Sequence, residues 1–236
     1  METTDKQTSI LPGRSASSSP VRKFIQLQAD LAIRMRRKRI VLFVSLLSSL
    51  TRPLTILDVG GVQEFWQWVG LIRDDMKIVL YNVSPAESKH STLISMVGDA
   101  RNMREFKDKE FQVVFSNSVI EHVGTYRHQR QMAEEVQRVG ERYYVQTPNR
   151  YFPIEPHFLF PFFQFLPLYF RIFLVAHFNL GWRGKILDKR EAVEAVKEIR
   201  LLTEKELKQL FPGAMIRREK FLGLTKSFIV YKGWEQ

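Results

Sequence analysis

The chain has 236 residues, of which 44% are hydrophobic, so it can bury the core of one large domain without disulfides. It has no cysteine, which excludes disulfides, thiolate metal sites and cysteine nucleophiles, and its five scattered histidines lack the paired spacing of a zinc site. The net charge of +11 lies mainly at the two ends, because residues 51–183 hold fifteen basic against fourteen acidic side chains. The cysteine and histidine content therefore predicts no metal site. The nearly neutral residues 51–183 argue against a nucleic-acid partner, because enzymes that act on nucleic acid more often carry basic surface beside the active site.

The N-terminal region is polar and then basic. Residues 1–20 are rich in Ser, Thr, Pro and Gly, which predicts a disordered tail. Residues 21–50 are expected to be helical, and their apolar end, residues 40–50, is shorter than the roughly 20 residues that cross a bilayer. This helix either packs on the domain or lies at an anionic membrane surface. No secretory signal is recognised, so we expect a cytoplasmic protein, and the second interpretation places it at the inner face of the membrane.

From residue 54 short apolar segments alternate with amphipathic ones. Strands are expected at Leu54–Val59, Ile78–Tyr81, Thr92–Val97, Gln112–Phe115 and Arg142–Gln146. Helices are expected after Val62, near Arg101–Phe106, over Arg127–Val139, and from the capping box Thr203–Glu206 to about Pro212. The runs Ala214–Phe221 and Thr225–Tyr231 follow as an edge hairpin. This order predicts an α/β fold: a Rossmann-like, seven-stranded, mostly parallel sheet with an antiparallel C-terminal hairpin, in one domain over residues 21–236.

An aromatic-rich segment interrupts this alternation. Residues 151–182 contain twelve aromatic residues and four prolines, and the prolines exclude a single transmembrane helix. We expect a helical insertion or lid over residues 151–200. Its aromatic side chains either pack on the domain or form an apolar acceptor pocket or membrane-facing surface.

Candidate binding residues follow each of the first four strands. Asp58-Val59-Gly60-Gly61 ends the first strand in a glycine turn, where a ligand can approach the backbone closely. The other candidates are Asn82 after the second strand, Asp99 and Ala100 after the third, and Ser116 and Asn117 after the fourth. Because ligands of open α/β sheets bind at the carboxyl ends of the strands, we expect these residues to share one crevice.

Over about Leu54–Gln146 these motifs together resemble the class I S-adenosylmethionine-dependent methyltransferases, in particular the type 11 family. The resemblance implies S-adenosylmethionine as cofactor, with Asp58 and Gly60 bordering its methionine moiety and Asn82 at its ribose. It places Asp99 and Ala100 at the adenine, and Ser116 and Asn117 in a segment that closes over the cofactor and faces the substrate. It implies methyl transfer by in-line displacement, and the aromatic insertion together with the basic residues 21–50 points to a small or lipid-linked, apolar acceptor.

The chain departs from the family pattern at two places. Val62 and Glu64 stand where the family has its second and third glycines, and Gly61 is expected to replace part of the lost backbone freedom. Asn82 stands where the family has a carboxylate, so we expect Asn82→Asp to tighten cofactor binding. The departures leave an alternative open: a catalytically inactive Rossmann-like module that binds a partner through its aromatic insertion. A nicotinamide oxidoreductase is disfavoured, because no GxGxxG follows the first strand.

Candidates for acceptor chemistry lie after the fourth and fifth strands. If the acceptor is a hydroxyl or an amine, a general base is required, and His122, Glu121 and His157 are the candidates. Asn149, Glu155 and His157 follow the fifth strand, where loops line the acceptor pocket in this architecture. The alternative is structural: Glu121 and His122 begin a helix, and the proline-rich loop around His157 is merely rigid.

Overall fold

The computed structural model describes residues 37–181 and 184–234, so the tail expected for residues 1–20 lies outside them, as does the first part of the helix expected for residues 21–50. Residues 37–48 are helical. The chain divides into two compact units, residues 1–42 and 43–236. The fold and the candidate site belong to the second unit.

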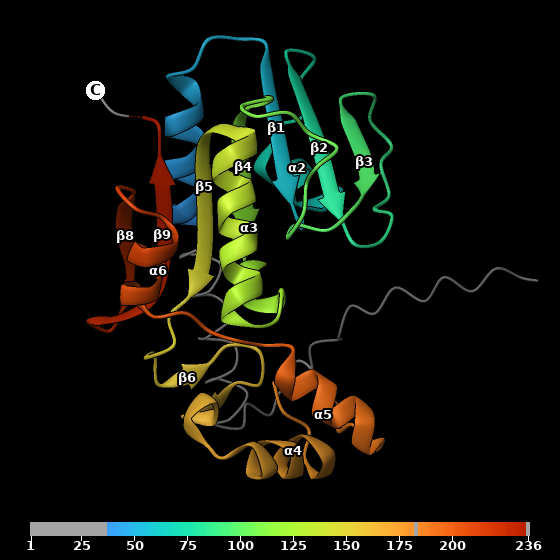
Figure 1. The fold of residues 1–236 in the computed structure, drawn as a ribbon, viewed down its shortest axis with the longest axis vertical. Helices are drawn as coiled ribbons and strands as arrows, with labels where there is room; N and C mark the ends of the chain where they lie inside the picture. Colours follow the sequence, from blue (N-terminus) through green and yellow to red (C-terminus); the bar gives the residue numbers. More distant parts are fainter. Residues whose placement is uncertain (1–36, 182–183, 235–236) are drawn as a thin grey trace, which may run out of the picture. The chain divides into compact units, whose positions relative to one another are not determined.

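A seven-stranded sheet forms the centre of this unit (Figure 1). Its strands are β1 (Leu54–Val59), β2 (Met76–Asn82), β3 (Leu93–Val97), β4 (Phe111–Asn117), β5 (Gly140–Pro148), β8 (Met215–Phe221) and β9 (Leu224–Lys232). They lie in the order β3-β2-β1-β4-β5-β9-β8; the first five are parallel, and β9 runs antiparallel to both β5 and β8. The Rossmann-like sheet with an antiparallel C-terminal hairpin is therefore confirmed.

Helices cover both faces of the sheet, because the central strands are apolar on both sides. On one face α3 (Tyr126–Val139) and α6 (Glu204–Leu210) bury Met132, Val136 and Leu207 in one cluster with side chains of the strands. On the other face lie α2 (Gln63–Val69) and residues 43–48. There the ring of Phe43 packs 4.4 Å from that of Phe115, centroid to centroid.

The termini of two helices follow from their sequences. The Thr203 side chain accepts a hydrogen bond from the backbone N–H of Glu206, and the Glu206 carboxylate accepts one from the Thr203 N–H, which is the predicted capping box. Thr125 caps α3 in the same way through His128.

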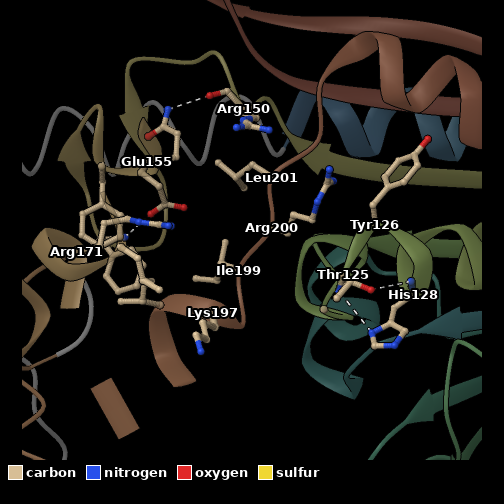
Figure 2. A pocket seen from close by; sticks show the side chains of 16 residues that line it. Thr125, Tyr126, His128, Arg150, Glu155, Arg171, Lys197, Ile199, Arg200 and Leu201 are labelled. Atoms are coloured by element: carbon tan, nitrogen blue, oxygen red, sulfur yellow. Dashed lines mark hydrogen bonds between the residues drawn. The ribbon is translucent and has the colours of Figure 1, made fainter. Parts of the chain in front are cut away.

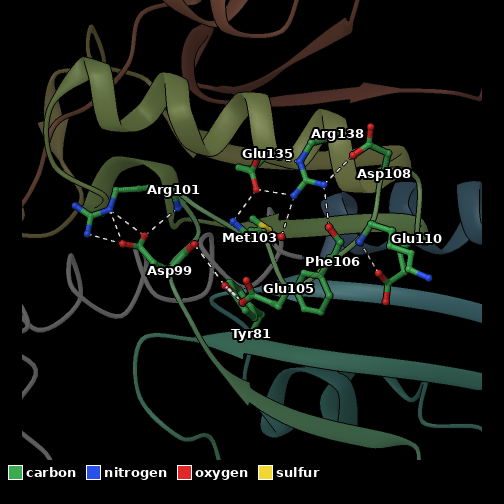
Figure 3. Close-up of polar contacts among 11 residues, drawn as sticks. Tyr81, Asp99, Arg101, Met103, Glu105, Phe106, Asp108, Glu110, Glu135 and Arg138 are labelled. Atoms are coloured by element: carbon green, nitrogen blue, oxygen red, sulfur yellow. Dashed lines mark hydrogen bonds and ion pairs between the residues drawn. The ribbon is translucent and has the colours of Figure 1, made fainter.

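The helix expected near Arg101–Phe106 is wrong, since this segment forms turns. Side chains of α3 bind its backbone groups instead (Figure 3). Glu135 accepts from the Met103 N–H at 2.6 Å, and Arg138 donates to the carbonyl oxygens of Met103 and Phe106 at 2.8 and 2.9 Å. These hydrogen bonds fix the loop after β3, with the candidate binding residues that it contains, to α3.

The aromatic segment and the residues after it lie beyond the carboxyl end of β5 (Figure 1). They form a small hairpin of β6 (Ile154–Glu155) and β7 (Phe160–Pro161), a 3-10 turn η2 (Phe163–Phe165), and the helices α4 (Leu168–His177) and α5 (Lys189–Lys197). The aromatic side chains divide into two groups. Phe158 and Phe163 are buried with α4 and α5, whereas Phe162, Phe170 and Phe173 are exposed. No helix in the described part of the chain is long and apolar enough to span a membrane.

Candidate cofactor and acceptor site

The carboxyl ends of β1, β2, β3 and β4 meet at one edge of the sheet. In register, Val59 lies between Tyr81 on β2 and Ser116 on β4, and Asn82 lies beside Val97 on β3. The turn after β1 begins at Gly60, whose φ of +79° is the left-handed conformation that favours glycine. The strand ends that carry the predicted cofactor-binding residues therefore meet at one edge of the sheet.

Asp58 is enclosed at the base of this turn. Only 1% of its surface is exposed, and its carboxylate accepts a hydrogen bond from Trp66 Nε1 at 2.7 Å. Burial raises the pKa of Asp58 to about 7, and the Trp66 hydrogen bond opposes this only in part. A Cβ on Gly61 would lie 1.8 Å from the carboxylate, so Gly61 permits this close approach. We expected Gly61 to supply the backbone freedom of the turn, but the glycine with a positive φ is Gly60.

Asn82 ties the end of β2 to the same turn. Its Nδ2 donates a hydrogen bond to the carbonyl oxygen of Gly61 at 2.8 Å. An ionised carboxylate at this position could not donate this hydrogen bond, so the amide of Asn82 has a structural role in the turn. The amide oxygen has no hydrogen-bond partner among the described residues, so it remains an acceptor for a ribose hydroxyl.

Asp99 and its neighbours form the adjacent part of the edge (Figure 3). The Asp99 carboxylate accepts from the backbone N–H, Nε and Nη2 of Arg101, and these contacts hold its pKa below its usual range. Its side chain is still 41% exposed, and a carboxylate has lone pairs for a further donor. Ala100 is nearly buried, while Val83, directly after Asn82, is 82% exposed. An apolar side chain and a carboxylate at neighbouring strand ends suit a heteroaromatic ring with an amino group.

The segment after β4 closes against the glycine turn. Ser116 and Asn117 end the strand, but Ser116 is fully buried and its hydroxyl lacks a hydrogen-bond partner among the described residues. Ser118 is held at a positive φ and donates to Gln146 Oε1 at 2.8 Å. Val119 then packs so closely on Gly60 that a Cβ there would lie 2.3 Å from Val119 Cγ2. The loop after β4 therefore packs directly over the glycine turn.

The same loop brings two predicted histidines together. Residues Ile120–His122 form a short 3-10 turn, and the ring centroid of His122 lies 4.8 Å from that of His157. Each ring has a carboxylate beside Nδ1: Glu198 lies 3.3 Å from His122, and Glu155 lies 2.6 Å from His157. A carboxylate at Nδ1 fixes the orientation of an imidazole and supports the protonated ring.

Glu121 completes this histidine pair as a buried acid that accepts from Thr147 Oγ1 at 2.9 Å. Glu121, His122 and His157 each present one potential ligand atom, and these atoms lie within 4.8 Å of one another. Ligand atoms of a tetrahedral zinc ion are only about 3.4 Å apart at the usual bond lengths. A spacing of up to 4.8 Å is therefore wider than that of a formed zinc site.

A cavity of about 570 Å³ is lined in part by Glu155, the partner of His157 (Figure 2). It is enclosed by the start of α3, the loop after β5, the aromatic segment and the residues that follow α5. Its lining residues are Gly124, Thr125, Tyr126, His128, Arg150, Glu155, Phe158, Phe163, Gln164, Leu168, Arg171, Val196, Lys197, Ile199, Arg200 and Leu201. The cavity therefore lies between the loop after β4 and the aromatic insertion.

The predicted acceptor residues are placed differently around this cavity. Glu155 lines it, and His157 lies behind Glu155 through their hydrogen bond. Asn149 lies elsewhere: its amide donates to the Thr225 carbonyl at 2.7 Å and accepts from the Tyr151 N–H, beside a smaller cavity of about 260 Å³.

Four cationic side chains of the cavity were not predicted: Arg150, Arg171, Lys197 and Arg200. Arg150 directly follows Asn149, which is the one hint that the sequence offers. The others come from separate elements of the insertion and the segment after it, and they share no motif.

Comparisons with known proteins relate one part of this chain to a family. Residues 71–142, from just before β2 to the start of β5, match the family model described as a methyltransferase domain. This part of the chain is therefore similar to methyltransferase domains, in agreement with the resemblance to the type 11 family. The match supports an S-adenosylmethionine-dependent enzyme, as the resemblance implied.

Solved structures are also similar to this chain, and the first of the two below has the same fold. A protein from Pyrococcus horikoshii OT3 is 17% identical, with a TM-score of 0.51 over 84% of this chain and 89% of that one. A SAM-dependent methyltransferase from Aquifex aeolicus is 11% identical, with a TM-score of 0.45 over 77% and 82% of the two chains. A search of curated protein sequences finds no match.

The residues of the strand edge fit S-adenosylmethionine. The exposed Val83 and the Asp99 carboxylate offer an apolar contact and an acceptor for adenine, and Asn82 Oδ1 offers an acceptor for the ribose. Asp58 is a buried carboxylate near the glycine turn, where the cationic methionine end would favour its ionised form. These assignments are proposals from side-chain chemistry.

Proposed function

We propose that this methyltransferase acts on a small or lipid-linked acceptor whose apolar part binds in the 570 Å³ cavity. The cavity itself is the observation that supports this proposal. Its apolar lining comes largely from Phe158, Phe163, Leu168 and Val196, all of which belong to the insertion and its helices. Gly124 and Thr125, on the loop after β4, also line the cavity.

The chemistry requires mainly positioning. S-adenosylmethionine supplies a methyl group that its sulfonium already activates. The chain holds the acceptor in line and excludes water, which can provide most of the rate. The proposed general base for a hydroxyl or amine acceptor is the Glu155–His157 pair. Glu155 lines the cavity and takes the proton, which passes to Nδ1 of the His157 ring, with the His122 ring beside it.

The proposal includes peripheral contact with an anionic membrane. Tyr169, Phe170 and Phe173 on α4 present an exposed apolar face, as does Phe162 just before it. Residues 1–50 add nine basic against three acidic side chains. Apolar side chains combined with net positive charge are typical of proteins that lie on anionic lipid.

Labelled methyl transfer tests the acceptor class. The full chain is incubated with methyl-labelled S-adenosylmethionine and separated apolar and polar metabolite fractions. We expect label in products that partition into an organic phase, and a His157→Asn variant should lose this activity while it keeps cofactor affinity. Label that appears only in the aqueous fraction would contradict an apolar acceptor.

A further inference from the structure

The acceptor cavity is unusually basic for a pocket with an apolar wall. Four cations line it, from the loop after β5 (Arg150), α4 (Arg171), the end of α5 (Lys197) and the segment after α5 (Arg200). Figure 2 shows Arg150, Arg171 and Lys197 on different sides of the same space. Glu155 is the one carboxylate among the lining residues.

That carboxylate does not neutralise the cations. Glu155 accepts from the backbone N–H groups of His157 and Phe158 at 2.8 and 2.7 Å, and it pairs with the His157 ring. Arg200 has its own partners, since it donates to Glu206 at 2.5 Å and to Gln129 at 2.7 Å. Arg200 is therefore part of the framework of the cavity.

The remaining three cations have no ion-pair partner among the described residues. Arg171 is partly buried, and its Nε has no hydrogen-bond acceptor there. Burial and the nearby charge of Arg150 both lower the pKa of Arg171. Two guanidinium groups that line one cavity and have no ion-pair partner among the described residues are unfavourable until an anion enters. Guanidinium groups match the planar geometry of carboxylate and phosphate oxygens, which makes such an anion the natural occupant.

We infer that the acceptor is amphipathic and anionic: Arg150, Arg171 and Lys197 bind a phosphate or carboxylate group while the apolar wall holds its hydrocarbon or aromatic part. This inference rests on the proposed function, because it names the substrate class of the same cavity. It also refines the expectation of an apolar acceptor, since a neutral hydrocarbon would leave Arg171 uncompensated.

Calorimetry with two matched probes tests the inference. Octyl phosphate and octyl glucoside share one chain length, and each is titrated as monomer into the full chain at about 0.15 M salt, where long-range attraction is screened. Octyl phosphate should bind at least about tenfold more tightly, as expected when charge-assisted hydrogen bonds form. Arg171→Gln and Lys197→Gln should each weaken octyl phosphate by about tenfold to a hundredfold and leave octyl glucoside unchanged.

Controls separate this inference from the proposed function. Arg217→Gln, at an exposed arginine of β8, should change neither probe. Lys197 is exposed at the end of α5, so its variant remains informative even if Arg171→Gln fails to fold. Binding of S-adenosylhomocysteine is measured on every variant and should be constant.

Three outcomes would overturn the inference. Equal affinity for the two probes, with S-adenosylhomocysteine still bound, refutes the anionic acceptor and leaves the proposed function intact. Octyl phosphate binding without S-adenosylhomocysteine binding means that the anion site is unrelated to methyl transfer. If Arg171→Gln weakens binding to phosphatidylserine vesicles but not to octyl phosphate, the cations recognise a membrane surface and not an acceptor in the cavity.

Discussion

The Asp58 carboxylate accepts a hydrogen bond from Trp66 Nε1 at 2.7 Å, behind the glycine turn that follows the first strand. Trp66 is itself fully buried in α2 and packs against Phe115 of β4, so the acid is fixed between the sheet and a helix. The contact joins β1, just before the glycine turn, to the helix that follows the turn. It also makes the charge of Asp58 sensitive to pH in the neutral range.

The first prediction concerns this titration. The pKa of Asp58 is about 7 in the folded state against an ordinary value of 3.8, so the folded state binds more protons between these values. Its stability therefore falls as pH rises from about 4 to about 7. Asp58→Asn retains an acceptor for Trp66 but cannot ionise. Relative to the wild type, the variant should gain about 2–3 kcal/mol in unfolding free energy between pH 5 and pH 8, measured by urea denaturation. Parallel pH profiles for the two proteins would contradict the buried acid.

The second prediction concerns Gly61. An alanine Cβ would overlap the Asp58 carboxylate, which is held by Trp66 and cannot move away. Gly61→Ala should therefore destabilise the chain by about 1–3 kcal/mol and weaken S-adenosylhomocysteine binding. Gly184→Ala is the control, because the nearest atom to its added Cβ is 3.9 Å away. Equal melting temperatures for the two variants would show that the turn has more room than this geometry allows.

The third prediction reverses an expectation from the sequence. By analogy with the family's carboxylate, Asn82→Asp should have tightened cofactor binding. The structure gives the Asn82 amide a carbonyl acceptor at Gly61, and an aspartate would place a negative oxygen against that carbonyl. We now expect Asn82→Asp to weaken S-adenosylhomocysteine binding by about 1–3 kcal/mol. Asn102→Asp makes the same charge change at an exposed position and should have little effect. Tighter binding by Asn82→Asp would mean that the amide contact is dispensable.

The fourth prediction concerns the exposed face of α4. Phe170 and Phe173 are each about half exposed, at 47% and 49%. If this face enters the interfacial region of a membrane, the full chain should sediment with phosphatidylserine vesicles, and increasing salt should weaken the association. The double variant Phe170→Ser and Phe173→Ser should bind at least about tenfold less well, because each ring contributes apolar burial. Leu222→Ser removes an even more exposed apolar side chain, at 85%, from the β8–β9 turn and should bind as the wild type does. Indifference of the wild type to vesicles would refute the membrane proposal and leave the methyltransferase domain untouched.

Local patterns predicted the sheet well and the loops less well. The run Leu54–Val59 was predicted to the residue, because a buried parallel strand is apolar throughout and a glycine turn ends it. The segment Arg101–Phe106 was misread as helix because its structure is set by Glu135 and Arg138, some thirty residues further along the chain. No local pattern contains that information.

The candidate site divides in the same way. His122 and His157 were recognised singly from their places after two strands, and only the fold brings their rings to 4.8 Å. Arg171 and Lys197 could not be found, because they belong to different helices of an insertion that follows no motif. Site residues that directly follow a strand can be predicted from the sequence. The positions of site residues from an insertion depend on how the insertion packs.

Binding of S-adenosylhomocysteine is the most direct test of the central claim. The full chain is titrated with this product analogue and, separately, with NAD, and an Asp99→Ala variant is titrated in parallel. We predict saturable binding of S-adenosylhomocysteine, none of NAD, and a loss of about tenfold or more in Asp99→Ala, since Asp99 would lose a charge-assisted hydrogen bond to adenine. A folded wild-type protein that binds no S-adenosylhomocysteine at millimolar concentration would contradict the methyltransferase assignment and favour a module that binds a partner through its aromatic insertion.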